Sequence, residues 1–250
     1  MEKELKPLWS KIFNFDWKFG LFLILLICIP RFILVLHGNE IANMQFVGIL
    51  MLVMAILPFL FLSKYGRRKI GIQKPTNYRW LFFALGIGIA FSILLYFLGD
   101  TLYGNTYQNW YQYIAKSYNI PQGINEQSKL IMFGISAFIG MSFSPIGEEL
   151  FFRGIVHSSF ANSVGNTKAS IIDSAAFALV HISHFGLVFH NQQWEFLLLP
   201  SLIWVLSMFA VSILFYVCRK RSGSILGAII CHAAFNLGMT YCIFYPLSGN

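Results

Sequence analysis

The chain has 250 residues, of which 57% are hydrophobic and only 11% are charged. A typical soluble domain carries about 25% charged residues, so a water-soluble globule of this size could not cover its surface. The same numbers exclude a disordered chain, a collagen-like repeat and a disulfide-rich secreted module. We therefore expect an all-α protein, a polytopic transmembrane helical bundle of about seven to eight membrane helices.

Seven apolar runs predict spanning helices, each of which needs about 20 mostly apolar residues. The runs cover residues 19–36, 44–62, 80–98, 130–147, 169–182, 196–217 and 224–245. The first run resembles a signal peptide, but no small-residue cleavage site follows it, so we interpret it as an uncleaved span. Pro30 predicts a kink there, and we expect the Arg31 head to extend toward the outer interface.

The net charge of +8 is distributed unevenly along the chain. Basic residues are frequent in segments 1–18, 63–79 and 218–223 and scarce in 37–43, 99–129 and 183–195. This alternation predicts a cytoplasmic N-terminus and an external C-terminus, because basic loops stay inside. We attribute the charge to membrane topology, with the lipid bilayer as partner and no nucleic acid. The four cysteines form no CxxC and are interpreted as small buried residues.

Segment 99–129 carries Tyr and Trp side chains among Asn and Gln and is too polar to span a membrane. We expect an interfacial helix or cap at the outer face. Residues 1–129 then comprise N-terminal membrane helices with this outer segment, and residues 130–245 a catalytic membrane core. Together they form one integral membrane domain.

Ionisable residues inside spans cost about 2.5–3.5 kcal/mol each on insertion, so they are usually functional. His181 lies 13 residues after Lys168, and His232 lies 11 residues after Arg221. At about 1.5 Å per residue, both reach a similar depth near the midplane. Glu148 joins them if its helix continues past Pro145. The predicted site residues are Glu148, Glu149, Arg153, His181, His232 and Asn236.

The two adjacent glutamates are expected to differ in their surroundings. Glu149 and Arg153 are four residues apart, in the favourable order for an ion pair. Glu148 points about 140° away from Arg153 on the helix and is left without a cation. Such a carboxylate can serve as a general base. The alternative is that these glutamates begin a solvated helix, that each histidine is a satisfied core residue, and that Asn236 only joins two helices.

Three motifs in late spans carry a resemblance to a known family. Residues 148–153 read EExxxR, residues 177–181 read FxxxH, and residues 232–236 read HxxxN. In this order the sequence resembles the CPBP family of intramembrane proteases, also called Abi, which includes the CAAX prenyl proteases. The resemblance covers residues 130–240, and the first three spans are similar only in character.

The resemblance implies a role for each motif residue. Glu148 would activate water with the help of His181, while His232 and Asn236 would form an oxyanion site. Glu149 and Arg153 would brace the first motif. Asp173 departs from the common pattern, and we expect it to pair with Arg153. We assign no role to His157, His184 and His190.

Metal dependence stays open at this point. Older descriptions call the family metalloproteases, and a zinc ion would be held by Glu148, His181 and His232. No HExxH motif is present, and zinc would occupy the glutamate that is needed as base. We therefore favour a site without a cofactor, with zinc as the alternative.

We expect an intramembrane endopeptidase that hydrolyses membrane-associated peptides or proteins and opens to the cytoplasmic half of the bilayer. Its compact length is typical of a multi-pass bacterial plasma-membrane protein. Peptide-signal maturation, bacteriocin maturation or immunity and CAAX-type processing all remain open as roles. A non-proteolytic membrane immunity or scaffold protein of the same fold is the alternative. A proton-coupled transporter is disfavoured, because we see no inverted repeats.

Overall fold

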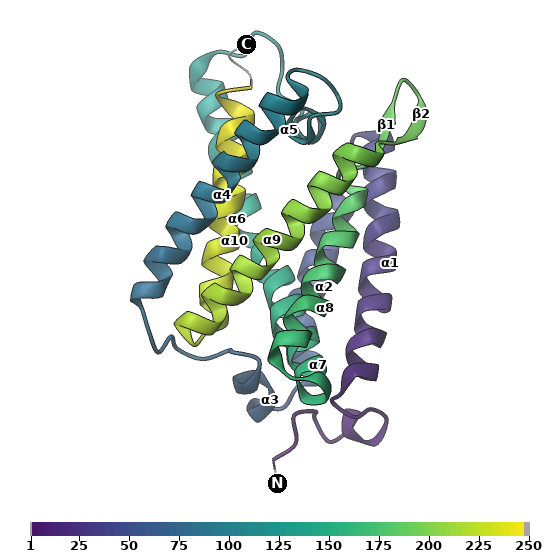
Figure 1. Cartoon of the computed structure of the whole chain (residues 1–250), viewed down its shortest axis with the longest axis vertical. Helices are drawn as coiled ribbons and strands as arrows, with labels where there is room; N and C mark the ends of the chain where they lie inside the picture. Colours follow the sequence, from purple (N-terminus) through teal and green to yellow (C-terminus); the bar gives the residue numbers. More distant parts are fainter. Residues whose placement is uncertain (1, 248–250) are drawn as a thin grey trace.

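Long helices run side by side between a basic end, where the N-terminus lies, and an opposite end that carries the C-terminus and a small hairpin (Figure 1). The computed structural model describes residues 2–247. Its elements are a 3₁₀ helix Trp9–Lys11, α1 Trp17–Ile41, α2 Gln45–Phe61, α3 Lys64–Lys69, α4 Arg79–Tyr103, α5 Trp110–Ala115, η2 Lys116–Tyr118, α6 Glu126–Glu148, η3 Glu149–Val156, α7 His157–Val164, α8 Asn166–Val180, η4 His181–Ser183, β1 Leu187–His190, β2 Gln193–Phe196, α9 Leu198–Ser222 and α10 Ile225–Phe244.

Five helices in the described part of the chain are long and apolar enough to cross a membrane. They are α1, α4, the continuous stretch Glu126–Val164, α9 and α10. Helix α2 has 17 residues and α8 has 15, so neither reaches this length. The polytopic helical character is confirmed, but the predicted count of seven to eight spans is not.

The loop predicted at 183–195 contains an antiparallel hairpin of β1 and β2, which the all-α prediction missed. Phe196 ends β2, so the helix predicted to begin there starts at Leu198 instead. Asn191 and Gln192 form the turn with positive φ angles. Two-residue hairpin turns favour this conformation because it matches the twist of the flanking strands.

Helix α6 continues past Pro145. This continuation was the condition for Glu148 to reach the depth of His181 and His232. The helix passes into the π-helical segment η3 and then into α7. All eight residues of η3 are buried. π-helical turns are rare and often occur at functional sites, and here the wide turns follow directly after Glu148.

Segment 99–129 forms a cap at one end of the bundle, and its Trp110 and Tyr111 side chains point inward. Trp110 and Tyr111 at the start of α5 are fully buried. The Trp110 indole donates to the Leu95 carbonyl at 3.2 Å, and the Tyr111 hydroxyl donates to the Ser92 carbonyl at 2.6 Å. These rings therefore anchor the cap to α4 instead of lying at the membrane interface.

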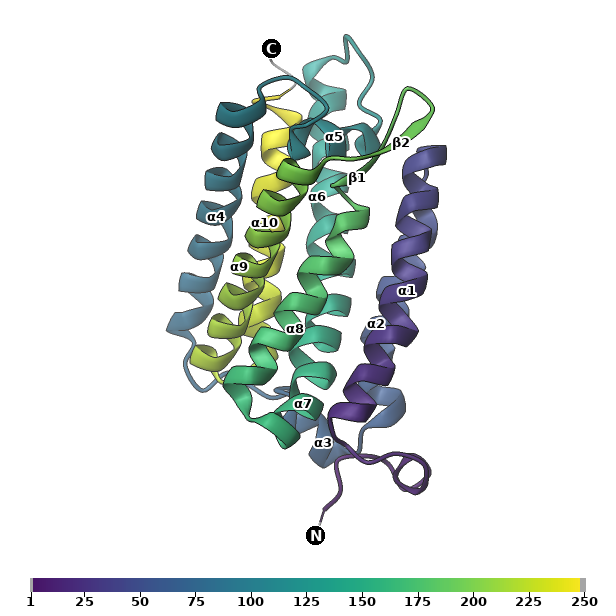
Figure 2. The ribbon, with the colours of Figure 1, turned by 45° about the vertical axis from the view of Figure 1, so that its right-hand side comes forward.

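Helix α4 runs beside α10, and both lie away from α1 in the view of Figure 2. The close approach depends on Gly88, where a Cβ atom would collide with the Cys231 carbonyl oxygen and the Ala234 side chain. A second close approach joins α6 to α2, where a Cβ at Gly147 would collide with the Met51 backbone. These two contacts hold α4 close to α10 and α6 close to α2.

Replacing Gly88 with Val should destabilise the bundle, because overpacking a tight contact costs about 1–3 kcal/mol. Gly86→Val is the matched control, since a side chain at Gly86 meets open space. Thermal unfolding in detergent micelles should give a lower Tm for Gly88→Val alone. Equal Tm values for the two variants would contradict the proposed close packing.

Candidate active site

A cavity of about 430 Å³ lies among α1, α2, α6, α8, α9 and α10 and reaches α5. Four of the six predicted site residues line it, namely Glu148, His181, His232 and Asn236. The other two, Glu149 and Arg153, lie behind this wall with fully buried side chains. The motifs from three separate helices therefore meet at one buried place.

The prediction that Glu148 has no cationic partner is wrong. The Arg31 guanidinium from α1 donates to both carboxylate oxygens, through Nη1 at 3.2 Å and through Nη2 at 3.1 Å. Both side chains are almost fully buried, so Arg31 does not extend to the outer interface. Helical facing relates Glu148 only to cations on its own helix, whereas a buried carboxylate can be paired by a cation from any element that reaches it. Ser144 also donates to the carboxylate, at 2.5 Å.

His181 presents one ring nitrogen to the cavity. Its Nδ1 lies 2.6 Å from the Phe177 carbonyl oxygen, which can only accept, so Nδ1 carries the proton. In the neutral ring, Nε2 is then an acceptor. It lies 3.4 Å from Arg31 and 3.9 Å from Glu148 Oε2. The last distance is too long for a hydrogen bond but allows one water molecule to contact both groups.

Glu149 joins the first and third motifs. One of its oxygens lies 2.8 Å from His232 Nδ1, and the other lies 3.3 Å from Arg153 Nε. The expected pair of Glu149 with Arg153 is therefore present. Arg153 also donates to Ser212 at 2.6 Å and lies over the Phe177 ring at 4.2 Å. This cluster fixes the His232 ring from behind, where it also stacks on Phe215.

Asn236 lies one helical turn after His232 on the wall of the same cavity. Its amide nitrogen donates to the Gly140 carbonyl at 2.8 Å, which ties α10 to α6. An amide NH₂ group has two hydrogens, so one remains for a ligand in the cavity. Asn236 thus joins two helices and is also available to a substrate.

The expected pair of Asp173 with Arg153 is wrong. Asp173 instead lies 2.7 Å from His157 Nδ1, and both side chains are buried. Arg153 contacts Glu149 and Ser212, and the Asp173 carboxylate therefore pairs with His157. His157 and Asp173 lie outside the cavity lining and connect α7 to α8.

Sequence reasoning missed two residues of the cavity wall. Arg31 was assigned to the interface because no signal in the sequence links α1 to α6. His184 was given no role, yet it lines the cavity, stacks against His181 at 5.3 Å and has a buried Nε2 without a hydrogen-bond partner. His184 follows His181 by three residues, and this spacing was the one signal in the sequence that could have indicated its place in the cavity wall.

The residues present do not fit a zinc ion. Within residues 2–247, no group of three or more His, Cys, Asp or Glu side chains is arranged to hold a metal. The Arg31 guanidinium contacts both Glu148 and His181, so a zinc ion held by these two side chains would lie directly beside a fixed positive charge. His232 directs Nδ1 to Glu149 and not to Glu148. A second cation beside Arg31 would be repelled.

This fold is a bundle of apolar helices, and Glu, His and Asn side chains line its internal cavity. Membrane proteins of this class can admit water and a polar substrate into the bilayer. Residues 130–238 match the model of the type II CAAX prenyl endopeptidase Rce1-like family. This match confirms the resemblance to the CPBP family over that segment, and at the family level it supports an intramembrane protease. No curated protein matches the chain. No solved structure matches it either.

Proposed function

We propose that this protein is an intramembrane endopeptidase that hydrolyses peptide bonds of membrane-associated peptides or proteins with water activated by Glu148. The observation that carries the proposal is the convergence of Glu148, His181, His232 and Asn236 on one cavity. The family match over residues 130–238 supports it. An immunity or scaffold protein would have no use for such a cavity.

Two acceptors can bind the attacking water. A water that replaces the long 3.4 Å contact of Arg31 at His181 Nε2 can donate one hydrogen to that nitrogen and the other to Glu148 Oε2, which lies 3.9 Å away. The water oxygen attacks the scissile carbonyl carbon while Glu148 takes a proton. The C–N bond then breaks, and the leaving nitrogen receives that proton from Glu148. The base is thereby regenerated without a covalent intermediate.

His232 and Asn236 are placed to hold the carbonyl oxygen as negative charge develops on it. His232 donates to Glu149 through Nδ1, so it can donate to the substrate through Nε2 only when the ring carries both protons. Arg153 limits the excess negative charge behind it.

The test is hydrolysis of fluorescein-labelled β-casein, an unstructured general protease substrate, by the purified protein in detergent micelles. We expect cleavage by the wild type and none by Glu148→Gln prepared in parallel. A folded wild-type protein that cleaves neither this probe nor peptides released from its own membranes would favour the scaffold alternative.

Metal removal should leave the activity unchanged, because Arg31 supplies the positive charge at Glu148. The measurement is the cleavage rate after exhaustive treatment with EDTA and 1,10-phenanthroline, together with elemental analysis of the same sample. A rate that falls to background and returns with one equivalent of zinc would overturn the metal-free proposal. It would then assign Glu148, His181 and His232 as ligands.

A further inference from the structure

The cavity opens at one end of the bundle. Of the lining residues, Ser117 of η2 and Ile139 of α6 are exposed, and Met44 and Val47 at the start of α2 are half-buried. Met44 and Val47 follow directly on the end of α1, and Ser117 follows directly on α5. The mouth is therefore at the end that carries α5 and the C-terminus (Figure 1).

The other end of the cavity is closed. Helices α2 and α6 meet at the Gly147–Met51 contact, one residue before Glu148. No described residue of α3, α7 or the chain between α3 and α4 lines the cavity. Phe151 and Phe152, which follow Glu149 in η3, are fully buried. The cavity therefore does not extend to the end at which the N-terminus lies.

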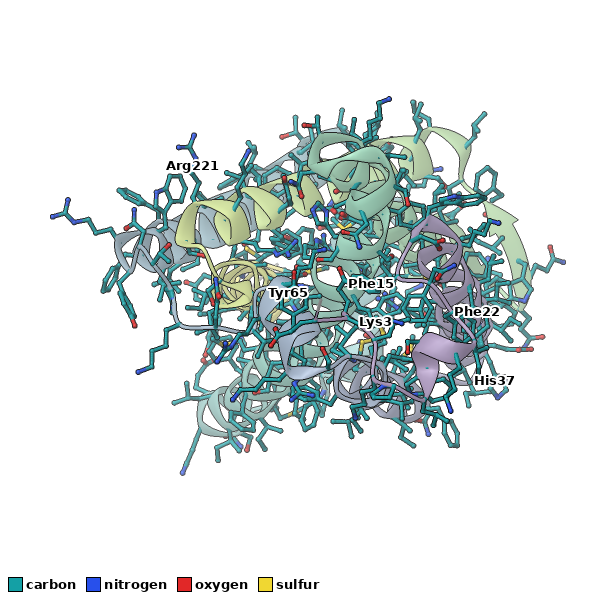
Figure 3. The ribbon with its side chains drawn as sticks, turned by 90° about the horizontal axis from the view of Figure 1, so that it is seen from below. Lys3, Phe15, Phe22, His37, Tyr65 and Arg221 are labelled. Carbon is teal, nitrogen blue, oxygen red and sulfur yellow. The ribbon has the colours of Figure 1, made fainter. Side chains whose placement is uncertain are left out.

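The closed end is also the basic end. Seen from below, Lys3 lies near the middle of this end and Arg221 at its periphery (Figure 3). The three segments rich in Lys and Arg all lie here, namely 1–18, 63–79 and 218–223. At the opposite end, residues 37–43 and 183–195 contain no Lys or Arg. Basic ends of membrane proteins stay in the cytoplasm.

We infer that the active site opens to the extracytoplasmic side and accepts an extended peptide segment from the outer half of the bilayer. The inference rests on the proposed function and extends it. It replaces the expectation of a cytoplasmic opening, because that expectation and a cytoplasmic N-terminus cannot both hold in this fold. The site would thus act on segments of membrane-anchored peptides that have already crossed the membrane, not on lipid-modified proteins in the cytoplasm.

The chemistry of the mouth fits an extended chain. Hydroxyl groups of Ser117, Tyr118, Ser136 and Thr240 line the same cavity as Asn236. An extended peptide in the bilayer needs partners for its backbone groups, because the hydrocarbon core supplies none. The apolar side chains of Met44, Val47 and Ile139 also line the cavity and can contact apolar side chains of the substrate.

The first test is cysteine labelling in intact cells with a membrane-impermeant maleimide. Ser117→Cys, at the mouth, should be labelled before permeabilisation. Lys64→Cys, on an exposed residue of α3, should be labelled only afterwards. The wild type is the background control for Cys28, Cys218, Cys231 and Cys242, which are buried or half-buried. Labelling of Lys64→Cys in intact cells, with Ser117→Cys protected, would overturn the inference.

The second test compares vesicle orientations with labelled β-casein, which cannot cross a membrane. Right-side-out vesicles should cleave it at least about tenfold faster than inside-out vesicles, with Glu148→Gln vesicles as background. Faster cleavage by inside-out vesicles would overturn the inference and leave the proposed function intact. Failure of the detergent-solubilised enzyme to cleave would instead contradict the proposed function, while the labelling result still decides the side.

Discussion

Replacing Glu148 with Gln is expected to abolish peptide hydrolysis in a protein that still folds, with a lower Tm because the buried Arg31 charge loses its carboxylate partner. Gln keeps the shape of the side chain and can still accept from Arg31, but it cannot take a proton from water. Losing a general base typically costs about 10²–10⁴ in rate. The rate should be measured on protein that elutes as one peak and shows a helical circular dichroism spectrum.

Glu149→Gln is the matched control for this prediction. Glu149 lies behind the cavity wall between His232 and Arg153, so its loss leaves the Arg153 charge buried and poorly paired. Removing one partner of a buried pair costs about 3–5 kcal/mol, so this variant should lose Tm as well as activity. A normal rate for Glu148→Gln would show that another group is the base.

Replacing Arg31 is expected to have an effect nearly as large as the loss of Glu148. The guanidinium contacts both Glu148 oxygens and lies 3.4 Å from His181 Nε2, so it fixes the two groups that would bind the attacking water. Arg31→Ala should therefore lower kcat by about 10²-fold or more, since a misplaced catalytic group costs about that much.

Two measurements separate this role from simple instability. Guanidinium ion at millimolar concentration should restore part of the activity of Arg31→Ala, because it fits the vacated place and binds both oxygens. Arg31→Lys should fold but cleave slowly, since an ammonium group cannot make the bidentate contact. An Arg31→Ala protein that cleaves at the wild-type rate would show that Arg31 has no part in the reaction.

The sequence by itself determined the membrane character and the identity of the cavity-facing motifs. Few charges and long apolar runs leave helices as the only way to satisfy the backbone in a bilayer. Glu148, His181, His232 and Asn236 stood out because polar residues are expensive in such runs. The pair of Glu149 with Arg153 followed from local helical geometry, which spacing along the chain encodes.

Only the tertiary structure decided the partners that come from different helices. Arg31 pairs with Glu148, which lies 117 positions away in the sequence. Asp173 pairs with His157 and not with Arg153. Helical periodicity fixes which face a residue occupies but not which helix packs against that face. From the sequence we expected an opening toward the cytoplasmic half of the bilayer, but the end at which the cavity opens depends on how α2 and α6 pack against each other. That is set by the packing of Gly147 on Met51, a contact that no local pattern in the sequence reveals.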